Sequence, residues 1–498
     1  MVNIVGAQLN GTLSVDDDAF YYLIIAKNIA ASGVSTFDHL SLTNGYHPLW
    51  LGVLVLQDLT VGPSIFVTLS LSALFLCGGL YLFLRLVAAA PGILQAALTF
   101  CFILLFERFG LAGMEVALLV FCVGLFVTAL DWAMAGGPRR GLVLGLAAAA
   151  CVGARIDSAF FIAPALIAAP ISRQGRGLAF AVLGGLGAIY AACNLAVFGV
   201  AMPISSTIKS LGGLQLNHRL LAQLGLGHDI QQRRSLFFML TTALLLVSPV
   251  LVILSKPKTI ARALAVATSV GGWIFLAKLV FLSSWVIWAW YNFAILFPLI
   301  SVFYVVVPAS TAWVAQLEAR AGAFGARAVT LAFAITGFGV IAGAAATSLA
   351  VPAAGRFTFA SINHLAIQRY AKTLGGAPVA MGDRAGSFAM EYTGGVVQLE
   401  GLVNDKAYLK VLTQRGDVRK LLCGRGVRFV VAYDRDLGAY DHLRFGVFRP
   451  ALTQFNGPNL DVWRADEVGH VEDTRLFDNR ANAGIGDNTL YIWRLRCA

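Results

Sequence analysis

Long apolar runs, separated by short polar connections, occupy the chain between residues 62 and 350. A helix of about 20 consecutive apolar residues is long enough to cross a bilayer. Hydropathy predicts about ten such spans, near residues 64–88, 91–107, 114–133, 141–155, 158–171, 178–199, 236–254, 264–282, 290–308 and 327–350. We therefore expect a polytopic α-helical membrane protein, with an eleventh span if a first helix precedes residue 1.

The opening segment, residues 1–61, has a different pattern. A helix with acidic residues in its first turn is predicted from an N-cap at Ser14 to about Ala31. Its apolar residues Phe20, Leu23, Ile24 and Ala31 can face the membrane. The stretch 51–59 is too short to cross a bilayer and is typical of a helix that lies in the membrane interface.

Residues 351–498 lose the long apolar runs and gain charge. Short apolar segments at 378–383, 396–399, 428–433 and 489–495 predict buried strands, and helical stretches at 405–412 and 417–422 lie between them. Strands that alternate with helices indicate a small α/β domain with a partly parallel sheet. The turn at 382–386 does not match a nucleotide-binding glycine motif, so we expect a structural turn there.

Lys and Arg residues fall in alternate connections between the predicted spans, including Arg85, 138–140, 173–176, 256–262 and Arg320. Such connections face the cytoplasm in most membrane proteins. The opposite connections, which contain Glu115, Arg155 and the segment 201–235, are then expected on the extracytoplasmic side. The opening segment and the C-terminal domain fall on that side too, so the predicted location is the cytoplasmic (inner) membrane.

Composition supports the membrane class. Hydrophobic residues make up 58% of the chain and charged residues 13%, whereas soluble domains carry about 25% charge. The net charge of +11 does not indicate nucleic-acid binding, because the sequence contains no basic tract with interleaved aromatic residues. Basic residues at a lipid surface explain it better.

The seven cysteines show no metal-ligand spacing. Five of them lie in apolar runs, where a small buried side chain is the simplest interpretation: Cys77, Cys101, Cys122, Cys151 and Cys193. Cys423 and Cys497 lie in the polar tail, where a disulfide can form if this region faces an oxidising compartment.

Three consecutive carboxylates, Asp16, Asp17 and Asp18, begin the first helix. The positive end of a helix accommodates one or two acids, but three clustered anions repel one another unless a cation or a proton shares the site. Asp17 or Asp18, aligned with Tyr21 or Tyr22 one turn later, could deprotonate a hydroxyl group. Alternatively, two of the acids could bind a divalent cation.

Further candidates fall on the same predicted side. Four cations, Lys209, Arg155, Arg233 and Arg234, could neutralise a phosphate. Each could instead contact lipid headgroups, which is the interpretation we favour for Arg233 and Arg234. Arg155 could also form an internal ion pair with Asp157. Glu115 is either a helix N-terminal anion or a second active-site acid, and His47 is either a packed turn residue or a donor to a sugar or phosphate.

The sequence DDAFYYLIIAKNIAASG, followed by TNGYHPLW, resembles the first outer loop of the bacterial GT-C glycosyltransferases. These membrane enzymes use polyprenyl-phosphate sugars and include mycobacterial arabinofuranosyltransferases, the lipid A aminoarabinose transferase and protein O-mannosyltransferases. The resemblance continues at 113–115, 155–157, 194–209, 290–291 and 399–405. It implies a bundle of about eleven to thirteen helices and an acidic base in the first outer loop.

This resemblance implies a function. We expect an inverting transfer of a sugar from a polyprenyl-phosphate donor to a hydroxyl group of an envelope glycan, lipid or protein. The expected base is Asp17, then Asp18, with Asp16 as a third acid before the usual pair. The donor is expected to contact Lys209, Arg155, His47, Tyr21 and Asn44. A divalent cation remains open, and the alternative function is a transporter or flippase for a lipid or polar solute.

Overall fold

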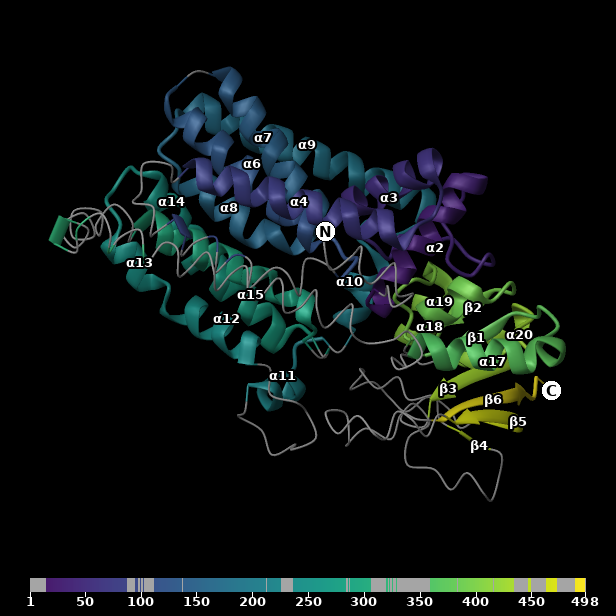
Figure 1. Cartoon of the computed structure of the whole chain (residues 1–498). Helices are drawn as coiled ribbons and strands as arrows, with labels where there is room; N and C mark the ends of the chain where they lie inside the picture. The colour runs from purple at the N-terminus through teal and green to yellow at the C-terminus, as the bar shows by residue number, and fades with distance from the viewer. Residues whose placement is uncertain are drawn as a thin grey trace.

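The computed structural model of the chain is mostly helical, with a small C-terminal sheet (Figure 1). It describes residues 15–86, 112–136, 138–211, 213–224, 236–283, 287–305, 359–382, 384–414, 416–433, 463–472 and 489–497, together with a few shorter pieces. The long helices run side by side, and the sheet with its own helices lies at one end of them.

Four of the described helices are long and apolar enough to cross a membrane. They are α4 (Ile65–Leu86), α6 (Val116–Met134), α9 (Arg173–Phe198) and the continuous helix formed by α14 (Ile260–Val266), a π-helical turn (Ala267–Gly271) and α15 (Gly272–Phe281). α9 packs against α7 (Pro138–Ala154) and leaves most of its apolar surface exposed, as expected of a helix that faces lipid. The apolar helices therefore support a membrane protein.

The predicted number of about ten spans is not confirmed. Within the described residues, the predictions at 141–155, 158–171, 236–254 and 290–308 coincide with helices that do not reach the length and apolar character of a span: α7, α8 (Ala159–Ala168), α12 (Leu236–Val247) and Trp290–Val305. The predicted span 236–254 divides at Ser248, because α13 (Pro249–Leu254) begins with a proline. Most of each of the spans predicted at 327–350 and 91–107 lies outside the described residues.

The opening segment forms two helices, α2 (Asp17–Ser32) and α3 (Pro48–Val61), which pack against each other. α2 begins at Asp17 with Asp16 as its N-cap, and the predicted cap Ser14 lies outside the described residues. Ala31 of this helix is exposed, but the expectation that Phe20, Leu23 and Ile24 face the membrane is wrong. All three are buried inside the protein, because α3 and the C-terminal domain both cover α2.

The C-terminal domain contains a six-stranded sheet in the order β2-β1-β3-β6-β5-β4. The strands β1 (Val379–Met381), β2 (Val396–Gln398) and β3 (Phe429–Tyr433) are parallel, and β6 (Thr489–Leu495), β5 (Trp463–Glu472) and β4 (Val447–Phe448) continue the sheet antiparallel. The prediction of a partly parallel sheet at 378–383, 396–399, 428–433 and 489–495 is confirmed. The sequence did not predict β4, β5 or the helices α17 (Phe359–Leu374) and α18 (Ala385–Glu391).

Alternate strand residues serve two different cores. Val379 and Met381 of β1 belong to the large core that continues into α17, α18 and the helical bundle. Ala380 belongs to a smaller core shared with α19 (Lys406–Thr413) and α20 (Val418–Gly424). This alternation follows from the two-residue period of a strand, and it places helices on both faces of the parallel half of the sheet.

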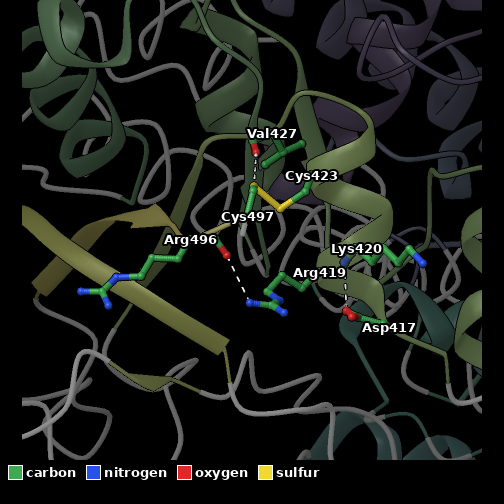
Figure 2. Close-up of a disulfide and its surroundings, with 7 residues drawn as sticks. All are labelled: Asp417, Arg419, Lys420, Cys423, Val427, Arg496 and Cys497. Atoms are coloured by element: carbon green, nitrogen blue, oxygen red, sulfur yellow. Dashed lines mark hydrogen bonds between the residues drawn. A yellow bond between two sulfur atoms is a disulfide. The ribbon is translucent and has the colours of Figure 1, made fainter.

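A disulfide joins Cys423 at the end of α20 to Cys497 just after β6, which confirms the pairing considered from the sequence (Figure 2). The Arg419 guanidinium donates to the carbonyl oxygen of Arg496 beside it, at 3.2 Å. The last strand is thus fixed to the helices on one face. Among the described cysteines of the apolar runs, Cys122 and Cys151 are buried as expected, whereas Cys77 and Cys193 are exposed on helix surfaces; Cys101 lies outside the described residues.

Candidate functional site

An open cavity of about 930 Å³, its mouth included, lies where α2, the ends of several bundle helices and the C-terminal domain meet. Its charged lining residues are Asp18, Glu115, Arg155, Asp157, Lys209 and Lys278. Aromatic side chains from Tyr21, Tyr22, Trp290 and Tyr291 line it as well, and Leu402 reaches it from the C-terminal domain. Among the described residues, the cavity thus collects three acids and three cations into one space.

The three consecutive acids have different positions. Asp18 lines the cavity, whereas Asp16 is an exposed N-cap whose backbone N–H donates to Ala112 O at 3.2 Å. The Asp17 carboxylate accepts hydrogen bonds from the backbone N–H groups of Gly386 and Ser387 and from the Ser387 hydroxyl, at 2.9, 2.9 and 2.7 Å. The structure therefore places Asp18 at the cavity and Asp17 at the first turn of α18.

The electrostatics of Asp18 suit a proton acceptor. Burial raises the pKa of its carboxyl from the ordinary 3.8 to about 7, although Lys209 opposes this change, and the nearby charges of Asp17, Asp16 and Glu115 add to it. A base whose pKa lies near neutral pH is half deprotonated under working conditions and still binds a proton well. Sequence reasoning placed Asp17 first, and the geometry favours Asp18.

Lys209 is the cation that balances Asp18. It lies in the last turn of α10 (Ile204–Lys209), with its ammonium group 5.6 Å from the ring centre of Tyr291 and 5.9 Å from that of Trp285. Burial by itself would lower the pKa of Lys209, but Tyr291 and Asp18 together raise it above its ordinary value. Lys209 therefore stays charged in the cavity.

Glu115 and Arg155 form a buried ion pair on the cavity wall. Burial would raise the pKa of Glu115, but the adjacent guanidinium of Arg155 holds it below its usual range. Arg155 also contacts Asp157 at 3.6 Å, and Asp157 accepts a hydrogen bond from Lys278 at 2.5 Å. Glu115 is thus a paired anion, which favours a role in holding Arg155 over a role as a second proton-transfer group.

His47 packs beside this pair. Its Nδ1 accepts a hydrogen bond from the backbone N–H of Ile156 at 3.4 Å, and its Nε2 lies 3.7 Å from Glu115 Oε1. Burial lowers the pKa of His47 to about 4. The ring is therefore neutral at pH 7, and the accepting Nδ1 leaves the proton on Nε2. His47 lines the cavity as a neutral group.

Of the two remaining predicted donor contacts, Tyr21 lines the cavity and Asn44 does not. The Asn44 amide accepts a hydrogen bond from Ile204 N–H at 3.0 Å and donates to Met202 O at 3.3 Å, so it fixes the start of α10 and does not line the cavity. Tyr21 lines the cavity, and its ring contacts Phe37 edge-on at 5.2 Å. Asn44 therefore acts on the site through the α10 helix that carries Lys209.

The remaining predictions concern two further cations and a shared metal ion. Arg233 and Arg234 lie outside them. In the part of the chain that the structure describes, no group of three His, Cys, Asp or Glu side chains is arranged to hold a metal ion. The acidic run divides between the cavity, which Asp18 lines, and the first turn of α18, which Asp17 contacts.

Sequence reasoning missed Lys278 and Ser387. Lys278 is the only charged residue in the apolar stretch 264–282, and an isolated charge in such a stretch is a functional candidate by default. That signal could have found it. No comparable signal identifies Ser387, because its contact with Asp17 joins residues 370 positions apart.

No known protein-family model matches this chain, and a search of curated proteins also finds no match.

Proposed function

We propose that this chain is an integral membrane glycosyltransferase of the GT-C type. It transfers a sugar from a polyprenyl-phosphate donor to a hydroxyl group of an envelope glycan, lipid or protein, with inversion at the anomeric carbon. The observation that supports it best is the position of Asp18, a partly buried carboxylate of raised pKa that shares an open cavity with the partly buried cation Lys209.

The proposed reaction is a single displacement. The acceptor hydroxyl gives its proton to Asp18 as its oxygen attacks the anomeric carbon, and the bond between that carbon and the phosphate oxygen breaks. The lipid phosphate leaves with the bonding electron pair. Because Asp18 becomes neutral in the same step, the charge of Lys209 is released to balance the new negative charge on the phosphate.

Other lining groups suit the two substrates. Arg155 is almost fully buried, and its Nε has no hydrogen-bond acceptor among the described residues, so it has one donor to spare for a ligand oxygen. Lys278 brings a third cation to the same cavity. The indole of Trp290 and the phenol ring of Tyr291 provide apolar faces beside polar edges, which suits the mixed surface of a sugar.

The disulfide supports an extracytoplasmic location for the C-terminal domain. Disulfides persist mainly in oxidising compartments, and Cys423 and Cys497 are joined. The domain contacts α2 directly through Asp17, so the cavity opens on the same side as the disulfide. This agrees with the sidedness that the basic connections predict.

The test uses the purified protein in liposomes, with a set of polyprenyl-phosphate sugars and lipid or glycan acceptors. We expect the wild-type chain to form a glycosylated product, and we expect Asp18→Asn to lower kcat by at least 100-fold, as for the loss of a general base. Asp58→Asn is the matched control, because Asp58 lies on α3 and does not line the cavity. Full activity of Asp18→Asn would rule out Asp18 as the base.

The same liposomes distinguish the transporter alternative. The charged lining residues lie at helix ends: Glu115 directly precedes α6, and Arg155 directly follows α7. Transporters instead place their charged sites at broken helices near the middle of the membrane. Movement of a labelled lipid or solute without any transferred sugar would support the transporter and contradict the enzyme.

A further inference from the structure

The first turns of α2 and α18 meet in a contact that joins the C-terminal domain to the candidate base. Three hydrogen bonds, all of 2.9 Å or less, run from Gly386 and Ser387 to the carboxylate of Asp17. A carboxylate at this position satisfies N–H groups that have no partner within α18 itself. Asp17 therefore serves as the cap of a helix from another domain.

The contact is also sterically tight. A Cβ atom added to Gly386 would lie 2.4 Å from the carbonyl oxygen of Asp17 and 3.0 Å from Cβ of Phe20. Only glycine allows the two helices to approach this closely without a shift of backbone. The spacing of α18 from α2 is thus fixed by the absence of a side chain at one position.

A buried chain of hydrogen bonds continues from this contact to the sheet. Asn363 of α17 donates to the Ser387 hydroxyl at 2.8 Å, and its own carbonyl oxygen accepts a hydrogen bond from the Tyr433 hydroxyl at 2.8 Å. Tyr433 ends the central strand β3. The Ser387 hydroxyl accepts from Asn363 and donates to Asp17. All three hydrogen bonds of the series therefore donate toward Asp17, so they polarise and reinforce one another.

The C-terminal domain also contacts the loop after α2. A Cβ atom added to Gly395 would lie 2.3 Å from Asp38 O, and one added to Gly45 would lie 1.9 Å from Leu402 O. Gly45 and Leu402 both line the cavity. The domain therefore contacts the opening segment at three places: the first turn of α2, the loop after α2 and the turn before His47.

Asp17 and Asp18 are neighbours in the first turn of α2. Successive side chains on a helix point about 100° apart, so a turn held at Asp17 has a fixed orientation for Asp18. We propose that Asp17 is a positioning residue, through which docking of the C-terminal domain on α2 holds Asp18 against the cavity. This proposal rests on the role of Asp18 proposed above.

The charges around Asp18 give the proposal a readout that a purely structural role would not change. Lys209 faces Asp18 from α10, Glu115 faces it from the start of α6, and Asp16 and Asp17 lie on its own helix. The negative charge of Asp17 contributes to the raised pKa of Asp18. Removing that charge by Asp17→Asn should therefore shift the acid limb of the pH profile of kcat/KM to lower pH.

The experiment compares four variants of the full chain in liposomes: Asp17→Asn, Ser387→Ala, Gly386→Ala and the control Gly424→Ala. Gly424 lies at the end of α20, where an added Cβ meets nothing within 4 Å. We expect the first three to lower kcat by at least 10-fold with KM for the donor changed less than three-fold. We expect the control to stay within two-fold of wild type.

The pH profile provides the second measurement. Asp17→Asn should move the acid limb to lower pH, whereas Ser387→Ala keeps the carboxylate and should lower kcat without moving the limb in that direction. If Asp18→Asn is inactive while Asp17→Asn, Ser387→Ala and Gly386→Ala all keep the wild-type kcat and acid limb, the positioning role is wrong and the base assignment stands. If Asp18→Asn is fully active, the base assignment fails, and this proposal fails with it.

Discussion

Replacing Asp18 with Asn should make the protein more stable at neutral pH while it abolishes transfer. The raised pKa means that the folded protein binds the Asp18 proton more tightly than the unfolded chain does. Well below pH 3.8 the Asp18 carboxyl is protonated in both the folded and the unfolded state, so it does not lower the free energy of unfolding. Between 3.8 and about 7 the unfolded state loses its proton first, so the free energy of unfolding falls as pH rises, and the full cost is present above about 7.

The magnitude follows from the same two values. The interval from 3.8 to about 7 corresponds to about 4 kcal/mol at about 1.4 kcal/mol per pH unit. Because Asp18 borders an open cavity, solvent reduces this figure, and we expect about 2 kcal/mol in the free energy of unfolding. Asn removes the ionisable group and with it this cost.

Thermal unfolding in detergent, followed by tryptophan fluorescence from pH 4 to pH 8, measures the effect. The melting temperature of Asp18→Asn should approach that of wild type at pH 4 and exceed it increasingly up to pH 8. Asp58→Asn is the comparison outside the cavity: because burial raises the pKa of Asp58 to about 6, this variant should show the same trend with a smaller amplitude. A melting temperature of Asp18→Asn at or below that of wild type at pH 8, or a difference that does not depend on pH, would refute the reasoning.

Three further outcomes follow from the charged groups and the disulfide. Glu115→Gln leaves the Arg155 guanidinium buried without its partner and should destabilise the protein by about 3–5 kcal/mol, whereas adding Arg155→Met should recover part of the melting temperature. Lys209→Met removes the cation that lowers the pKa of Asp18, so the acid limb of kcat/KM should move above pH 7, and Lys209→Arg should move it less. Cys423→Ser should lower the unfolding free energy of the C-terminal domain by about 2–4 kcal/mol, measured by thermal unfolding with and without reductant; an unchanged melting temperature would mean that the disulfide does not stabilise the fold.

The candidate site shows how far side-chain chemistry can be inferred from a sequence. The acidic run, Glu115, Arg155 and Lys209 were all identified as candidates, because charged residues are conspicuous beside apolar helices. The structure brings Asp18, Glu115, Arg155 and Lys209 to one cavity. Asp17 instead accepts three hydrogen bonds from the C-terminal domain, and no local pattern in the chain predicts this contact.

The same limit applies to α2. Its apolar residues were expected to face lipid, since an amphipathic helix beside a membrane usually turns its apolar face to it. Phe20, Leu23 and Ile24 are buried instead, because the C-terminal domain and α3 provide a protein surface of the same character. Hydrophobicity requires burial, but it does not distinguish lipid from protein as the partner.

The sequence by itself determined the class of the protein, the helical character of its apolar runs, the parallel strands of its C-terminal domain and the cysteines able to pair. These properties depend on local patterns, because apolar residues repeat about every two residues in a strand and every 3.6 residues in a helix. The tertiary structure decided which of three adjacent carboxylates borders the cavity and which one caps a distant helix. Adjacent residues share every local signal, so only contacts across hundreds of residues could separate the roles of Asp17 and Asp18.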